Sequence, residues 1–149
     1  MKVVKFKEAH LAGFLPREEM EDSLWPNFAE RGAQYGQRGP AWTLTTDEGK
    51  VVASGGAVLL HSKLAEGWVM TTADIEKHAL AFHRAFLNGI KIIFEVYKIR
   101  RLQIAVKLEW TKAVQWAHRL GFEAEGIMTA FDPDGADYLR LAIVRNGDG

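Results

Sequence analysis

The sequence predicts an α+β (mixed α/β) domain built around a largely antiparallel sheet. The first observation is residues 67–98, where a short apolar run with strand character changes into apolar positions repeated at three- and four-residue steps. That spacing is typical of a helix with one buried face. The second is the set of short alternating segments around it, bounded by turn residues, which indicate strands. We expect about seven strands in a central sheet, with helices on both of its faces.

Length and composition narrow the class of protein. The 149 residues are the usual size of one domain, so we expect a single domain over residues 1–149. The net charge is zero, and broad nucleic-acid binding needs a basic excess, so no nucleic-acid partner is expected. The chain has no cysteine, which excludes disulfides, thiolate zinc sites and a cysteine nucleophile.

Nothing in the sequence suggests membrane insertion or export. The N-terminal residues have strand character and lack the apolar core of a signal peptide. The longest apolar stretch, residues 51–60, contains two glycines and is too short to span a bilayer. We therefore expect a cytoplasmic protein with no membrane partner.

The first half of the chain is expected to supply four strands and two helices. The alternating or apolar segments 3–6, 41–46, 50–61 and 66–72 are interpreted as strands, with a hairpin turn at 47–49 and a bulge or close backbone approach at Gly55 and Gly56. Residues 8–14 suggest a short helix, and a second one follows from Pro16, with apolar anchors up to Phe28. The glycine-rich segment 31–40 is interpreted as a loop.

The long helix has one ambiguous point, at Gly89. The apolar and the polar stripes both continue through this residue, which predicts one helix as far as Lys98, with a neighbouring element packed close to Gly89. The alternative is a helix that ends at Gly89 and is followed by a strand over residues 90–96, from Ile90 to Val96. Both interpretations stay open at this point.

The second half repeats the alternation of strand and helix. A strand at 101–106 leads into an amphipathic helix from Trp110 to its C-terminal stop at Gly121. Two strands follow, at 122–131 and 137–145. They are separated by Asp-Pro-Asp-Gly at 132–135, a tight turn in which glycine adopts a positive φ.

This order of elements resembles the GNAT superfamily, the acyl-CoA N-acyltransferase fold. The resemblance covers nearly the whole chain and is most specific at residues 113–126, where the helix ends in Gly121-Phe122 and opens the last hairpin. It implies acetyl transfer from acetyl-CoA to an amine carried by a small molecule or a protein.

The resemblance also implies where acetyl-CoA binds. Its pantetheine arm would pair with the strand backbone at Val69, Met70 and Thr71. Its pyrophosphate would lie at the start of the next helix, near Thr72 and Asp74, because unpaired amides and the helix dipole favour an anion there. Together with Lys77, these are the expected cofactor-binding residues: Val69, Met70, Thr71, Thr72, Asp74 and Lys77.

The sequence departs from the family pattern at these places. The stretch after the strand has no glycine, and Asp74 brings a carboxylate that repels phosphate. Thr71 and Asp74 have nearly the spacing of a capping box, so this helix start is expected to satisfy its own amides. The position of the family's frequent tyrosine acid is Ala117. The pattern is most similar to degenerate GNAT-like proteins of tailed phages, which implies, as an alternative, a protein without catalysis that serves as a virion component, a homo-oligomer or an interaction partner.

Few side chains qualify for other chemistry. His61 and Glu66 flank the strand that leads toward the acceptor, and either could act as a general base, although ordinary loop residues explain them equally well. His78 and His83 are five residues apart and so do not share a helix face as two metal ligands would. No metal site is expected.

Overall fold

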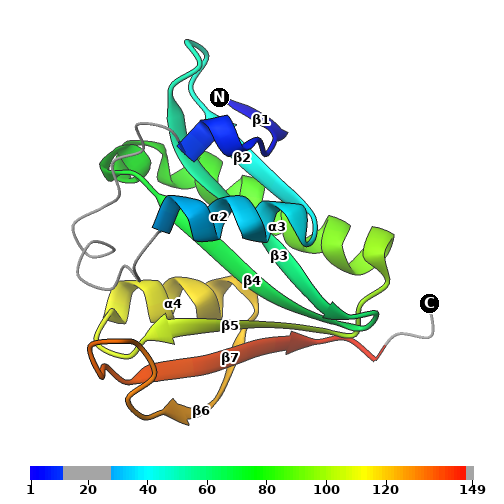
Figure 1. Cartoon of the computed structure of the whole chain (residues 1–149), viewed down its shortest axis with the longest axis vertical. Coiled ribbons are helices and arrows are strands. Elements are labelled where there is room, and N and C mark those ends of the chain that lie inside the picture. The colour runs from blue at the N-terminus through cyan, green and yellow to red at the C-terminus, as the bar shows by residue number, and fades with distance from the viewer. Residues whose placement is uncertain (12–27, 147–149) are drawn as a thin grey trace.

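The structure, a computed structural model, describes residues 1–11 and 28–146. They form one seven-stranded sheet in the order β1-β2-β3-β4-β5-β7-β6 (Figure 1). Neighbouring strands run antiparallel except β4 and β5, which are parallel. The strand bounds are β1 Lys2–Lys5, β2 Ala41–Thr45, β3 Val51–His61, β4 Leu64–Thr71, β5 Arg101–Lys107, β6 Glu123–Met128 and β7 Tyr138–Val144. The predicted class and the largely antiparallel sheet are confirmed.

Helices cover both faces of this sheet. The 3₁₀ helix η1 and helix α2 lie over β1 to β4 on the face turned to the viewer in Figure 1, and α3 lies behind the sheet. Buried residues of α3 and α4 belong to the same apolar core, so both helices pack on the far face. The helix bounds are η1 Glu8–Leu11, α2 Phe28–Gln37, α3 Ala79–Tyr97 and α4 Thr111–Leu120. A second 3₁₀ segment, η2 Ala73–His78, leads directly into α3.

The core lies between the far face of the sheet and helices α3 and α4. Phe122, 2 % exposed, and Leu141, fully buried, are among its largest buried side chains. Burying one such side chain stabilises the fold by about 1.5–3 kcal/mol. Gly121, with φ of 106°, closes α4 by donating its N–H to the carbonyls of Ala117 and His118, and it directs Phe122 into this core. The motif predicted from the sequence therefore has a clear packing role.

The ambiguity at Gly89 is resolved in favour of one long helix. Helix α3 passes through Gly89 and continues over residues 90–96 to Tyr97. A Cβ added at Gly89 would lie 3.4 Å from the Trp42 ring on β2, so glycine allows the helix to approach the sheet there. A 3₁₀ turn at the start, η2, is the one departure from the predicted helix.

The predicted loop at 31–40 is wrong. Most of it is helix α2, which ends at Gln37. A Cβ on Gly32 would lie 2.6 Å from a methyl of Leu11, and one on Gly36 would lie 2.3 Å from the Phe6 ring. Both glycines therefore let α2 pack closely, although glycine lowers helix propensity and made the segment resemble a loop.

Two predicted helices fall partly beyond the described residues. Of the short helix expected at 8–14, the structure describes η1 up to Leu11. The helix expected from Pro16 lies within 12–27, outside the described range, apart from its end at Phe28. By contrast, the turn at 132–135 is confirmed: Gly135 has φ of 84°, and its N–H donates to the carbonyl of Asp132.

A small buried network fixes η1 to the sheet. The Nδ1 atom of His10 accepts the Lys7 N–H at 3.0 Å and lies 2.7 Å from the Thr43 hydroxyl, which lies 2.9 Å from the Ser54 hydroxyl. Since Nδ1 is an acceptor, the imidazole is neutral in this arrangement. Burial, and then the charge of Lys7, lower the pKa of His10 below its ordinary value of 6.5.

This network predicts a stability that depends on pH near neutrality. Because the pKa of His10 is lower in the folded than in the unfolded chain, the unfolded chain takes up the proton first. The free energy of unfolding should be highest above pH 7 and should fall as the pH drops below about 6.5. Urea denaturation between pH 5.5 and 8 measures this. His10→Gln should remove the dependence, and His61→Gln, at an exposed position, should keep it.

Candidate functional site

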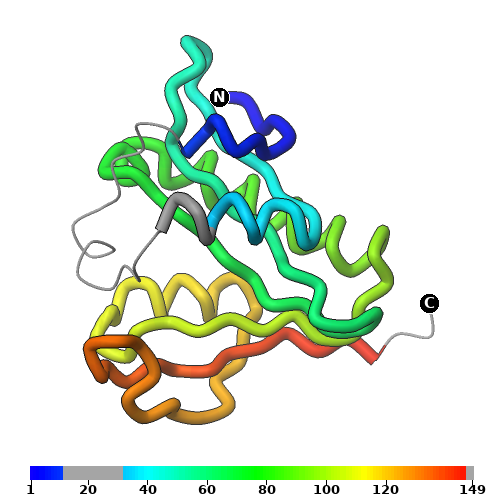
Figure 2. Tube along the Cα trace, viewed as in Figure 1, coloured from blue at the N-terminus to red at the C-terminus, as the bar shows by residue number. Residues whose placement is uncertain are grey.

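The candidate site lies where β4 and β5 separate. These strands pair at only three positions, and the last pair joins Glu66 to Gln103. Strand β4 continues to Thr71 and β5 to Lys107, and Figures 1 and 2 show the two strands running apart beyond that pair. We call the region beyond the Glu66–Gln103 pair the divergence. It interrupts a sheet that is otherwise continuous, and it does so between its only two parallel neighbours.

The backbone of Val69 faces the divergence. The Lys63 carbonyl accepts hydrogen bonds from the N–H groups of Arg100 and Arg101, so this residue directs its backbone toward β5. The Trp68 carbonyl, by contrast, points toward Gly55 on β3. Backbone groups alternate in direction along a strand. The N–H and C=O of Val69 therefore point away from β3 and into the divergence.

The start of the following helix differs from the expectation. The Thr72 hydroxyl donates to the Val52 carbonyl at 3.0 Å and makes no capping hydrogen bond. Asp74 forms ion pairs with Lys50 at 2.7 Å and Lys77 at 3.7 Å. The hydrogen bond from Lys50 is the main reason that the pKa of Asp74 is lowered. The capping-box prediction is wrong, because the N-cap is Thr72 and not Thr71, and it has no side-chain cap hydrogen bond. The carboxylate of Asp74 pairs with the two ammonium groups instead.

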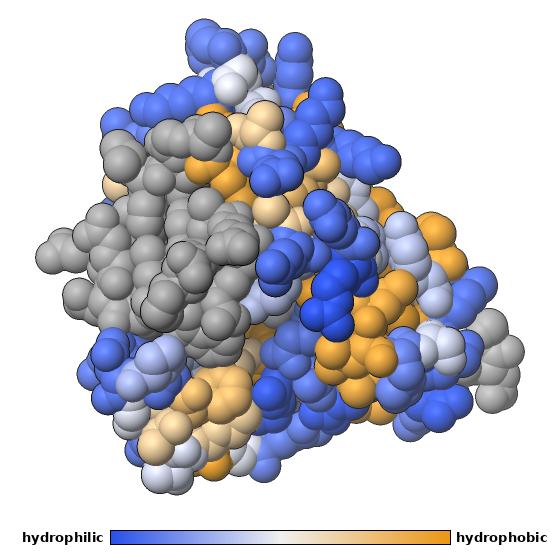
Figure 3. Space-filling model, in the orientation of Figure 1, coloured by the Kyte–Doolittle hydropathy of each residue, from blue (hydrophilic) through white to orange (hydrophobic). Residues whose placement is uncertain are grey.

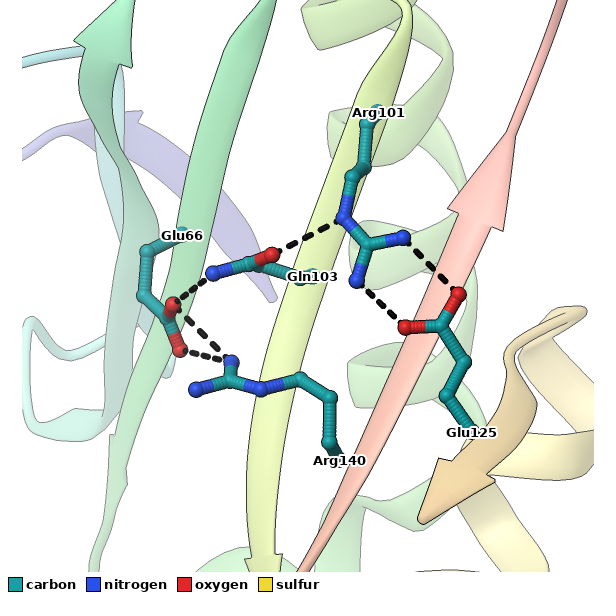
Figure 4. Close-up of polar contacts among 5 residues, drawn as sticks. All are labelled: Glu66, Arg101, Gln103, Glu125 and Arg140. Carbon is teal, nitrogen blue, oxygen red and sulfur yellow. Dashed lines mark hydrogen bonds and ion pairs between the residues drawn. The ribbon is translucent and has the colours of Figure 1, made fainter.

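A polar network crosses the sheet at the base of the divergence (Figure 4). Glu66 accepts hydrogen bonds from Gln103 at 2.8 Å and from Nη1 of Arg140, which lies 3.0 and 2.9 Å from its two oxygens. Arg101 donates to Gln103 at 2.8 Å and binds both oxygens of Glu125. That contact lowers the pKa of Glu125. These five residues, from β4, β5, β7 and β6, are called the polar network below.

The two expected base candidates lie far apart along β4. Glu66 lies in the polar network, at the base of the divergence. His61 is exposed at the β3–β4 hairpin, where its Nδ1 accepts the Lys63 N–H at 3.0 Å. That hairpin is at the opposite end of β4 from Thr71. Glu66 is therefore nearer than His61 to Val69 along the strand, and it is the candidate at the base of the divergence.

Aromatic side chains join α3 to α4 on the far face. The rings of Phe82 and Trp116 stack with centroids 4.9 Å apart, and Phe86 meets Trp116 edge-on at 4.8 Å. The Trp116 indole donates to Nδ1 of His83 at 3.0 Å. Since α3 follows β4 and α4 follows β5, this contact links the helices that continue the two separating strands. The sequence indicated the apolar spacing within each helix but not this pairing between them.

Within residues 1–11 and 28–146, no group of three histidine or acidic side chains could hold a metal ion. Over the same residues, no helix is long and apolar enough to cross a membrane.

Comparison by sequence gives no match. No protein-family model matches the chain, and no curated protein is similar enough in sequence to do so. Comparison by structure gives a different result, because the arrangement of elements can be similar where few residues are identical.

Several acetyltransferase structures are similar over almost the whole chain. The ribosomal-protein-S18-alanine N-acetyltransferase from Escherichia coli superposes with a TM-score of 0.75 at 19% identity, covering 99% of this chain and 96% of that one. A variant of the spermidine N-acetyltransferase SpeG from Vibrio cholerae gives 0.75 at 13% identity, covering 96% and 92%. A GNAT-family acetyltransferase from Bacillus anthracis gives 0.71 at 14% identity, covering 95% and 93%. The chain therefore has the fold of the GNAT acetyltransferases.

Proposed function

We propose that the protein transfers an acetyl group from acetyl-CoA to an amine, and that the divergence is where the thioester binds. The observation that carries this proposal is the early end of β4–β5 pairing at Glu66 and Gln103. Beyond that pair, no strand of the described residues lies beside the Val69 backbone on the side away from β3. The shared fold with acetyltransferases supports the same reaction type. The chain would then act as one GNAT-like domain.

The residues present fit the arm of acetyl-CoA better than its phosphates. An extended amide-containing arm can pair with the Val69 backbone as an added strand would. At the phosphate end, Asp74 opposes an anion, but Lys50 and Lys77 next to it supply two cations. Thr71 and Met70 complete the strand, and Thr72 leads into η2. Phosphate binding would therefore depend on lysine side chains rather than on a glycine-rich loop.

The chemistry requires an unprotonated amine. Acetyl-CoA supplies a thioester: the amine nitrogen bonds to its carbonyl carbon, the C–S bond breaks, and the thiol leaves with a proton. Glu66 is the candidate to receive the proton that the amine gives up, directly or through water. Gln103 and Arg140 hold its carboxylate in one orientation at the base of the divergence.

Binding of CoA is the most direct test. If the divergence binds it, CoA at 100 times its dissociation constant should stabilise the fold by about 2.7 kcal/mol and raise the melting temperature. Amide shifts in NMR spectra should centre on residues 69–77. No binding of acetyl-CoA at millimolar concentration by calorimetry would rule out the proposal.

Replacing Asp74 should strengthen CoA binding. Asp74→Asn removes the repelling charge and releases Lys50 and Lys77, which can then pair with phosphate. We expect the dissociation constant for CoA to decrease about threefold to tenfold, measured by calorimetry at low salt. Asp47→Asn is the matched control, because Asp47 also forms an exposed ion pair, with the N-terminal amine. Weaker binding in Asp74→Asn than in Asp47→Asn would contradict this account of the site.

The alternative is a GNAT-like protein that has lost catalysis and serves as a phage virion or interaction component. The observations that favour it are the carboxylate at Asp74, the occupied carboxylate of Glu66, and Ala117 in place of the family's tyrosine. Turnover of any amine with acetyl-CoA would exclude this alternative. Failure to bind CoA, combined with genes for virion proteins next to its own, would support it.

A further inference from the structure

The face of the sheet turned to the viewer carries a band of polar side chains in its lower part, where β5 and β7 lie (Figures 1 and 3). Helix α2 covers β3 and β4 on this face, whereas no described helix covers β5 and β7 (Figure 1). Figure 3, in the same orientation, shows a band of hydrophilic side chains in this lower part, between two hydrophobic patches. The polar network is located there. An acceptor that approaches the divergence from this side would therefore meet the polar network first.

The carboxylates of the network are already neutralised. Glu66 is paired with Arg140, and Glu125 is paired with Arg101 through both of its oxygens. Binding a polyamine requires carboxylates that are free to pair with ammonium groups. The two carboxylates and their two arginines have no net charge together, so this face has no excess of negative charge to attract a polyamine, which favours an acceptor of a different kind.

Arg140 differs from Arg101 in the donors that it leaves unused. Each of the three nitrogens of Arg101 has a partner in Gln103 or Glu125. Within the polar network Arg140 uses Nη1 alone (Figure 4), and its Nε and Nη2 atoms have no hydrogen-bond partner among the described residues. Its side chain is 21% exposed, so a ligand can reach it.

These unused donors lie next to the divergence. Arg140 is opposite Ala105 on β5, two residues beyond Gln103, where the paired part of β4 and β5 ends. Trp68, two residues beyond Glu66 on β4, is on the same face, and its buried indole N–H has no hydrogen-bond partner among the described residues. The unused donors of Arg140 thus lie at the β7 side of the divergence, next to the small side chain of Ala105.

Resting on the proposed function, we propose that the acceptor is an amine that also carries a carboxylate, and that Arg140 binds this carboxylate. Arginine presents planar N–H groups that match a carboxylate, and charge-assisted hydrogen bonds of this type are about twice as strong as neutral ones. With its carboxylate on Nε and Nη2 of Arg140, a small amino acid or dipeptide extends toward the divergence. Its amine then lies on the side of the thioester and of Glu66. Arg140 is a residue that determines specificity, not a catalytic one.

The test compares acceptors that share an amine. A dipeptide with a free C-terminal carboxylate, the same dipeptide as its amide, and spermidine are assayed with acetyl-CoA. We expect the dipeptide to have the highest kcat/KM. Arg140→Gln should lower kcat to a similar extent for all acceptors, because Arg140 also orients Glu66, and should raise KM about tenfold or more for the dipeptide alone. Arg140→Lys, which keeps the charge, should restore part of the loss.

Arg101→Gln is the matched control. It also leaves a network carboxylate without its arginine, but it removes no unused donor, so the preference for the carboxylate should remain. Spermidine turnover above that of the dipeptide, or equal losses for the dipeptide and its amide in Arg140→Gln, would refute the proposal. If no amine is acetylated, the proposed function fails separately. NMR titration with the dipeptide then still tests this inference, because shifts near Arg140 in the original chain and their loss in Arg140→Gln are expected.

Discussion

Gly56→Ala should lower the free energy of unfolding by about 3 kcal/mol. A Cβ at this position would lie 2.1 Å from the Pro40 carbonyl oxygen and 2.7 Å from the Cα of Ala41. Both are backbone atoms at the start of β2, the strand that pairs with β3, and they cannot rotate away as a side chain could. The same Pro40 carbonyl accepts the Ala57 N–H at 2.9 Å, so the methyl group would also stretch a ladder hydrogen bond. Urea denaturation followed by circular dichroism measures the loss.

Gly126→Ala is the control for this prediction. Gly126 is also in a strand, β6, but a Cβ there would meet no atom within 4 Å. Its stability should stay within about 0.5 kcal/mol of the original chain. Equal denaturation midpoints for the two variants would show that the close approach at Gly56 is relieved at no cost. The sequence predicted either a bulge or a close approach at this point, and the structure confirms the close approach.

Most of the fold could be predicted from the sequence, because the local sequence signals agreed with the packing in the folded chain. The period of α3 continued through Gly89, since glycine there serves the contact with Trp42. Gly121 ended α4 in both prediction and structure. The prediction failed at α2 because there the local signal disagreed with the packing. Gly32 and Gly36 allow close contacts with η1 and Phe6, but in the sequence alone they look like loop residues.

The site was less predictable, because it depends on contacts between distant segments. The polar network joins Glu66 to Arg140, which are 74 positions apart, and Arg101 to Glu125. One signal was present: Arg101 and Gln103 alternate along one strand and so share a face. Nothing local indicated that β5 would lie beside β4 for only three pairs. Likewise, Asp74 was expected to cap its own helix. Its ion pair with Lys50, which lies just before β3, joins two segments that are distant in the sequence and had no local signal.

Val69→Pro should weaken CoA binding tenfold or more. Proline removes the N–H of Val69, which faces the divergence, and its ring occupies the space where an extended arm would pair. The pairing with β3 should survive, because the neighbouring residues, and not Val69, direct their backbone groups toward β3. Proline is tolerated in strands at positions whose N–H is outside the ladder. Calorimetry with CoA measures the change in affinity, and thermal denaturation verifies that the variant is folded.

Val69→Ala separates the backbone from the side chain. This variant shortens the half-buried side chain and keeps the backbone N–H. Few contacts are lost, so its CoA affinity should stay within about threefold of that of the original chain. The ratio between the two variants therefore reports the backbone contribution. If Val69→Pro is folded and binds CoA as tightly as Val69→Ala does, the thioester arm does not pair with β4. The shared fold with the acetyltransferases would then have to serve a purpose other than binding acetyl-CoA at the divergence.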